Sequence, residues 1–130
     1  MRLDETNYVT IAEQAIDRLL QKKDNKGRQI KPLTTSQIRN LLGMTADIYN
    51  DVMNMKGDKL DQEIIGRVNY LKIRFIYEAG RDEKVNAFVE EAKVVEHIGE
   101  IGNSKQQYVL FSRYMEALVA YRKFKGGRDE

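Results

Sequence analysis

Apolar residues recur at helical spacing along nearly the whole chain. From Tyr8 to Lys23 they fall at positions i, i+3, i+4 and i+7, the pattern of a helix with one buried face. The same spacing predicts further helices from Thr34 to Met55, Leu60 to Ala79, Asp82 to Ile101 and Ser104 to about Gly126. No segment of the sequence has the pattern of a strand. We therefore predict an all-α fold, a compact bundle of about five helices.

Side chains near two of the predicted helix starts match the capping box, in which an N-cap hydroxyl and a glutamine three residues later bond each other's backbone amides. Thr34 matches Gln37 in this way, and Ser104 matches Gln107. Gly80 is placed to end the third helix in the left-handed conformation. The buried side of that helix is expected to hold Leu60, Ile64, Val68, Leu71, Phe75, Ile76 and Ala79.

The composition fits a single folded domain that spans residues 1–130. Hydrophobic residues make up 42% of the chain, enough to build a core at this length. The absence of cysteine excludes disulfides and thiolate metal sites and suits a reducing cytoplasm. No run of about 18 uncharged apolar residues occurs, and the N-terminal residues lack a signal pattern. We therefore expect a cytoplasmic protein without a membrane segment.

No set of residues points to catalysis. His97 is the only histidine and has no second histidine or cysteine with which to share a metal, so we expect a solvated surface side chain. The paired acids Glu90 and Glu91 belong to a charged segment of the kind that usually faces solvent. No glycine-rich phosphate loop follows a strand. The prediction is a protein that is not an enzyme and has no cofactor or metal site.

Charge is distributed unevenly along the chain, although the net charge is only +2. Residues 82–100 hold six acids and two bases, a balance of −4, whereas residues 105–128 hold six bases and one acid, a balance of +5. Residues 66–81, with four bases and one acid, carry +3, and residues 22–31, with five bases and one acid, carry +4. The near-neutral total therefore conceals basic segments suited to nucleic acid.

One stripe of the third predicted helix combines cations with aromatic rings. Arg67, Tyr70, Arg74, Tyr77 and Arg81 are spaced 3, 4, 3 and 4 residues apart and lie roughly opposite the apolar face. Guanidinium groups bind phosphates, and tyrosine rings or guanidinium planes can stack on bases, so this stripe suits RNA. The alternative is that both tyrosines bury part of their rings against a neighbouring helix while the arginines only solvate the surface.

Two other classes of function remain open from the residues alone. Thr34 to Met55 can be divided at Gly43 into a helix-turn-helix that binds DNA. The crossing position before the turn holds the large Arg39, and the supposed recognition helix carries Asp47 and Asp51, whose charge repels phosphate. We therefore prefer one long helix with Gly43 in its interior. A helical scaffold that contacts only protein is the second alternative.

Three segments of the sequence resemble a known family. They are residues 33–39 (LTTSQIR), residues 70–81 (YLKIRFIYEAGR) and residues 111–121 (FSRYMEALVAY), which precede Gly126-Gly127. In this order they resemble the small subunit of type III-A CRISPR effector complexes, the Csm complexes. The resemblance extends over nearly everything after Lys31.

The resemblance implies a small all-α protein without catalytic activity that acts in prokaryotic antiviral defence. Copies in that family stack head to tail as an inner filament beside the backbone subunits, which carry the guide RNA, and near the large subunit. They help to hold the duplex of guide RNA and target RNA through contacts to its backbone. We add the expectation that the acidic segment 82–100 of one copy faces a basic end of the next.

The candidate RNA contacts come from two sources. The resemblance gives Arg39, Lys72, Arg74, Arg81 and Arg113, with the reservation that Lys72 lies at the edge of the apolar face and can instead extend over the core. The charge distribution alone gives Arg67, Arg122 and Lys125, and the stacking candidates are Tyr70 and Tyr77.

Overall fold

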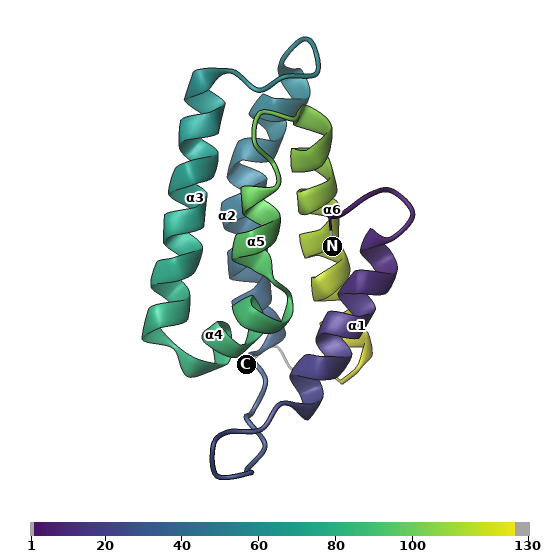
Figure 1. Ribbon diagram of the computed structural model, residues 1–130, viewed down its shortest axis with the longest axis vertical. Helices are drawn as coiled ribbons and strands as arrows, with labels where there is room; N and C mark the ends of the chain where they lie inside the picture. The colour runs from purple at the N-terminus through teal and green to yellow at the C-terminus, as the bar shows by residue number, and fades with distance from the viewer. Residues whose placement is uncertain (1, 127–130) are drawn as a thin grey trace.

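The computed structural model describes residues 2–126, which form six helices joined by short connections (Figure 1). The described residues contain isolated bridges, such as the one between Lys23 and Gln29, but no strand. The all-α bundle predicted from the apolar spacing is therefore confirmed. The helices are α1 (Tyr8–Gln21), α2 (Thr35–Asn54), α3 (Gln62–Arg81), α4 (Glu83–Glu91), α5 (Val94–Gly99) and α6 (Lys105–Phe124).

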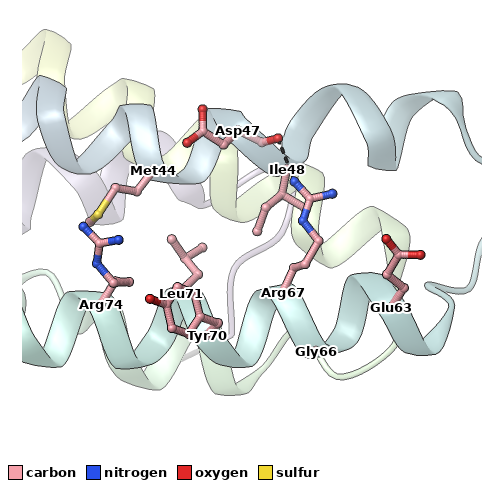
Figure 2. A pocket seen from close by; sticks show the side chains of 9 residues that line it. All are labelled: Met44, Asp47, Ile48, Glu63, Gly66, Arg67, Tyr70, Leu71 and Arg74. Carbon is pink, nitrogen blue, oxygen red and sulfur yellow. Dashed lines mark hydrogen bonds between the residues drawn. The ribbon is translucent and has the colours of Figure 1, made fainter.

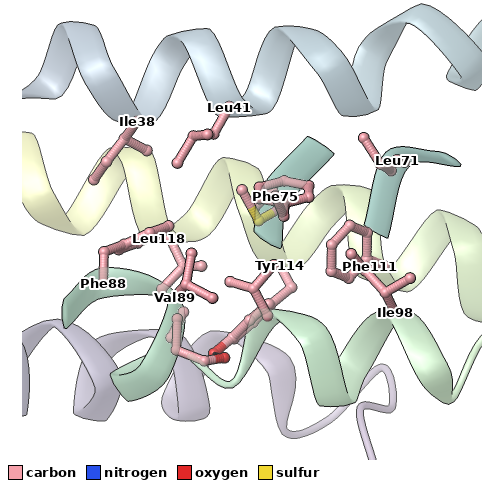
Figure 3. Close-up of a cluster of buried hydrophobic side chains, with 14 of the residues drawn as sticks. Ile38, Leu41, Leu71, Phe75, Phe88, Val89, Ile98, Phe111, Tyr114 and Leu118 are labelled. Carbon is pink, nitrogen blue, oxygen red and sulfur yellow. Dashed lines mark hydrogen bonds between the residues drawn. The ribbon is translucent and has the colours of Figure 1, made fainter. Parts of the chain in front are cut away.

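Helix α6 lies in the middle of the bundle. It packs against α1 on one side and α2 on the other, while α3 packs against α2, α4 and α5. In Figure 1 the long helices α2, α3 and α6 run along the length of the molecule, and the short helices α4 and α5 lie in front of them. The core is aromatic at its centre, where the rings of Phe75 and Phe111 meet edge to face with centroids 6.4 Å apart (Figure 3).

The start of α2 forms the predicted capping box. The Thr34 hydroxyl accepts from the Gln37 amide at 3.1 Å, and the Gln37 side chain accepts from the Thr34 amide at 2.9 Å. The box predicted at Ser104 is only half formed. Ser104 accepts from the Gln107 amide, but the Gln107 side chain donates to the carbonyl of Leu3 instead.

The predicted helix from Asp82 to Ile101 is wrong as a single element, because the chain breaks between α4 and α5. Lys93 takes the left-handed conformation there, with φ of 51°, although it is not glycine. The break leaves the carbonyl of Ala92 without a helical partner, and the buried Tyr114 hydroxyl donates to it at 2.7 Å. A side chain of α6 thus satisfies the end of α4.

The structure also corrects two predictions about α3. Gly80 lies inside the helix and not in the left-handed conformation, because α3 continues to Arg81. Ile76 is half exposed and is not part of the core, since it lies at the edge of the apolar face. The other core positions predicted for this helix are buried.

Helix α2 runs without a break through Gly43. This continuity confirms the preferred interpretation of one long helix and contradicts a helix-turn-helix between Thr34 and Met55. Nothing in this segment presents a separate recognition helix to DNA.

The only histidine is buried, which corrects the expectation of a solvated side chain. His97 is 3% exposed, and its Nδ1 lies 2.9 Å from Glu100 Oε1. Its ring packs edge to face on Tyr114, with centroids 5.0 Å apart. His97 is thus a core residue with a polar partner.

Candidate RNA-binding surface

The outward face of α3 exposes aromatic and apolar side chains. Tyr70 is 59% and Tyr77 60% exposed, and Ile73 lies between them with a similar exposure. More than half of each tyrosine is therefore open to solvent, and at most part of each ring lies against the bundle. Single exposed apolar residues are ordinary, but a contiguous row of them marks a surface that contacts something else.

The arginines of α3 lie beside this row, on the side that faces α2. Arg67, Arg74 and Arg81 are seven residues apart, which places successive side chains about 10.5 Å apart along the helix. The three arginines differ in whether their guanidinium groups already form hydrogen bonds or ion pairs within the fold.

Arg67 joins α3 to α2. Its guanidinium forms an ion pair with Asp51 and also donates to the carbonyl of Asp47 at 3.0 Å. The hydrogen bond with Asp51 raises the pKa of Arg67. These two contacts fix the spacing of the helices at this point, so most of the donor capacity of Arg67 serves the fold.

Arg74 is exposed, and no residue in the described part of the chain forms an ion pair or hydrogen bond with its guanidinium. It stands at one end of a groove of about 370 Å³ between α2 and α3 (Figure 2). An arginine that is buried or already paired binds a further anion weakly. Arg74 is neither, so its guanidinium can bind an anion.

Arg81 is exposed at the end of α3. Its guanidinium lies 5.8 Å from the centroid of the Tyr77 ring and 3.6 Å from the carboxylate of Glu78. It borders a second groove of about 550 Å³ along the same junction of α2 and α3. Asn40 and Lys84 line that groove too, and the sequence patterns did not identify either. Lys84 was missed because it sits in the acidic segment.

The remaining candidates from the resemblance lie outside these two grooves. Arg39 is exposed on α2 and its guanidinium is 3.4 Å from the Thr35 hydroxyl. Lys72 is half buried on α3, and Arg113 is exposed on α6. The structure brings Arg74 and Arg81 onto one face with Tyr70 and does not gather all the predicted cations.

The two cations predicted to bind RNA at the end of α6 are used inside the bundle. Arg122 is 7% exposed, its Nε donates to the Leu33 carbonyl at 2.9 Å, and burial lowers its pKa. Lys125 pairs with Asp17 at 2.7 Å and with Glu13 at 3.3 Å, and the Asp17 hydrogen bond raises its pKa. A signal for Arg122 was present, because it follows Leu118 by four residues on the buried side.

The acidic segment is partly neutralised by α1. Glu91 accepts from Lys22 Nζ at 2.8 Å and from Arg18 Nε at 3.3 Å. The hydrogen bond from Lys22 lowers the pKa of Glu91, and the same contact raises the pKa of Lys22. Glu83 and Glu96 show no ion pair within the described residues.

None of the described helices is long and apolar enough to cross a membrane. Within residues 2–126, no group of three or more histidine, cysteine, aspartate or glutamate side chains is placed to hold a metal ion.

Comparison with known proteins identifies the family. The model of the Csm2 Type III-A family matches residues 13–128. The chain is 45% identical to a protein named CRISPR system Cms protein Csm2 from Streptococcus thermophilus, over 98% of both chains. It is 37% identical over the full length to a protein of the same name from Mycobacterium tuberculosis (strain CDC 1551 / Oshkosh). A third, from Enterococcus italicus, is 34% identical over 89% of this chain and 87% of its own. These matches confirm the resemblance found in the sequence, and the chain belongs to the Csm2 family of type III-A CRISPR systems.

Proposed function

We propose that this chain is a non-catalytic small subunit of a type III-A CRISPR ribonucleoprotein and that it stabilises the duplex of guide RNA and target RNA. The observation that carries the proposal is the face of α3 toward α2, where Arg74 and Arg81 are exposed beside two grooves and are flanked by Tyr70 and Tyr77. This arrangement supplies charge and aromatic surface without any group for chemistry.

The proposed contacts are to phosphate and are independent of sequence. Guanidinium groups bind phosphate oxygens in a fixed fork, and phosphates are common to every nucleotide. Sequence is read by pairing between guide and target, so the protein needs only to recognise backbone and shape. Arg39, Lys72 and Arg113 stay in the proposal as secondary contacts. Arg122 and Lys125 are left out because they hold the bundle together.

The other proposed partners are the backbone and large subunits and further copies of this chain, stacked head to tail. The apolar side chains of Ile73 and Ile76 support a protein neighbour on the side of α3 away from Arg74. Glu96 and Ile76 line a groove of about 610 Å³ on that side, between α3 and the pair α4–α5. An acidic rim of this kind suits a basic segment of the next copy, such as the loop with Lys26 and Lys31.

The test uses the assembled complex with the double variant Arg74→Ala/Arg81→Ala. We expect weaker binding of target RNA and a plot of log affinity against log salt that is shallower by roughly 0.7 to 0.9 for each phosphate that the variant no longer binds. Arg67 is kept, because its removal would also loosen the α2–α3 junction. Helical content and thermal stability should match the parent.

The matched control is Lys56→Ala/Lys59→Ala, which removes the same net charge from the exposed connection between α2 and α3. It should leave the salt dependence of RNA binding close to that of the parent. If the double arginine variant assembles and binds target RNA like the parent at every salt concentration, the proposed RNA surface is wrong. A protein-only scaffold would then be the better description.

A further inference from the structure

The groove between α2 and α3 has an apolar floor. Ile48 of α2 and Leu71 of α3 point toward each other across it and are almost fully buried (Figure 2). Met44 and Tyr70 also line it, and its volume is about 370 Å³. No side chain of the described residues fills this space, and the two residues of its floor are apolar.

The charges at the groove are arranged along its length. Figure 2 shows Arg74 at one end, then Tyr70, then Arg67, with Glu63 beyond Arg67 at the opposite end. Arg67 is neutralised by Asp51, whereas Arg74 has no such partner among the described residues. The acids Asp47 and Glu63 also line the groove, so the end at Arg74 is the one that suits an anion, and the Glu63 end repels phosphate.

Tyr70 is the aromatic wall of the groove. Its ring is 59% exposed, and no hydrogen bond to its hydroxyl is formed within residues 2–126. Nothing in the packing of the bundle requires an aromatic ring at this position, since Leu71 and Phe75 face the core. The pairing of an exposed ring with a free guanidinium one turn away is the combination that binds an unstacked nucleotide.

We propose that this groove receives one unstacked nucleobase of the bound RNA. The base lies against the Tyr70 ring over the Ile48–Leu71 floor, and its phosphate binds Arg74. The groove accepts any base, because aliphatic side chains and a ring face carry no directional hydrogen bonds. This inference rests on the proposed function, since the RNA must already lie along this face of α3.

A protein side chain is the competing occupant, and the charges favour the nucleotide. An aromatic or aliphatic anchor from a protein would use the floor but would leave Arg74 facing solvent without a partner. A nucleotide uses both, because its base and its phosphate are joined through a single ribose. The part of the groove between Tyr70 and Arg74 thus matches one nucleotide.

The experiment is a double-mutant cycle in the assembled complex between Tyr70→Ala and single abasic positions moved along the target RNA. At the position that meets the groove, the abasic substitution should accelerate dissociation from the parent complex roughly fivefold or more, because the base that lies on Tyr70 is lost. In the Tyr70→Ala complex, that additional acceleration should disappear. At the other positions the abasic substitution only removes a base pair, and that effect is common to both complexes and cancels in the cycle.

Tyr70→Phe is the matched control, because it keeps the ring and removes only the hydroxyl. It should behave as the parent at every abasic position. Since Tyr70 is mostly exposed, both variants should melt at the temperature of the parent. A photoreactive phenylalanine derivative at position 70 should crosslink to target RNA, which is a second and independent measurement.

The outcomes separate this inference from the function on which it rests. The effects of Tyr70→Ala and of each abasic position on the dissociation rate could turn out to be additive at every position, while Arg74→Ala/Arg81→Ala still weakens binding. In that case no nucleobase occupies the groove, but the proposed RNA surface remains supported. A crosslink from position 70 to another protein subunit also overturns the inference, because it places a side chain in the groove. If the double arginine variant has no effect either, the proposed function itself fails.

Discussion

Helices α3 and α6 have the same length of 20 residues and both have a positive balance of charge, yet the molecule uses them in opposite ways. Helix α6 has nine buried residues, among them Arg122, whereas α3 has five, all apolar. The cations at the end of α6 bind the Leu33 carbonyl and the acids of α1. Of the cations of α3, Arg67 is used in this way and Arg74 is not.

The difference shows that the net charge of a helix indicates a binding surface only when the burial of its charged residues is known. A central helix is surrounded by neighbours, so its polar groups must find partners inside the fold. A helix at the edge of the bundle has one face without neighbours, so its charges stay available. Position in the bundle therefore decides which basic helix keeps its charges available for the proposed RNA contact.

The sharpest test of this comparison removes an aromatic ring from each helix. Phe111→Ala in α6 should lower the free energy of unfolding by about 3–5 kcal/mol, because it opens a cavity at the centre of the core. Tyr77→Ala in α3 should change it by less than about 0.5 kcal/mol, because that ring is exposed. Chemical denaturation of the isolated chain measures both. Similar destabilisation of the two variants would show that α3 is as central to stability as α6.

A smaller effect on stability is expected when a buried arginine and an exposed arginine are each replaced. Arg122→Met should cost about 1–3 kcal/mol of stability, because the buried Leu33 carbonyl no longer accepts the hydrogen bond from its Nε. The matched variant Arg74→Met should leave stability unchanged and weaken RNA binding, so the two changes affect different measurements. The two predictions are checked by measuring the thermal unfolding and the rate of target RNA dissociation of the same two variant complexes. An Arg122→Met variant with full stability would contradict a structural role for that side chain.

The smallest effect concerns the acidic segment and depends on pH. Because Lys22 lowers the pKa of Glu91 below its ordinary value of 4.5, the pair stabilises the fold above that pH, and the contribution is lost as the pH falls through the lowered pKa. Lys22, whose pKa is raised above 10.5, loses its share as the pH rises through the raised value. Glu91→Gln should therefore cost about 0.5–1 kcal/mol at neutral pH and almost nothing at strongly acidic pH.

Denaturation of parent and Glu91→Gln across that range measures the difference directly. Glu83→Gln serves as the control, since Glu83 is exposed and shows no ion pair among the described residues. A difference between parent and Glu91→Gln that persists at strongly acidic pH would exclude the ion pair as its cause.

Much of the fold follows from local sequence, because a helix repeats every 3.6 residues and its apolar positions reveal the buried face. This is why the bounds of α2 could be predicted, whereas the exposure of Tyr70 and Tyr77 was one of two alternatives that the sequence left open. The break at Lys93 could not, because the hydroxyl that satisfies the carbonyl of Ala92 comes from α6. The role of Arg122 likewise depends on Leu33, which lies 89 residues away in the sequence.

The same distinction between local sequence patterns and contacts across the fold applies to the candidate site. The spacing of Arg67, Arg74 and Arg81 was visible in the sequence, but their different uses depend on acids of α2. The grooves could not be predicted at all, since each is formed by two helices at a particular separation. Asn40 and Lys84 became candidates only when α2 and the start of α4 were seen side by side.

The contacts of Arg67 with Asp51 and Asp47 have a kinetic consequence. They set the width of the α2–α3 groove before any RNA arrives, so the groove is preorganised and its occupant meets a surface that needs little further ordering. Among variants of one such interface, association rates differ little and dissociation rates carry most of the change in affinity. Tyr70 and the apolar floor should therefore determine how long a target strand is retained, whereas the exposed charges of Arg74 and Arg81 should also influence how quickly it is found.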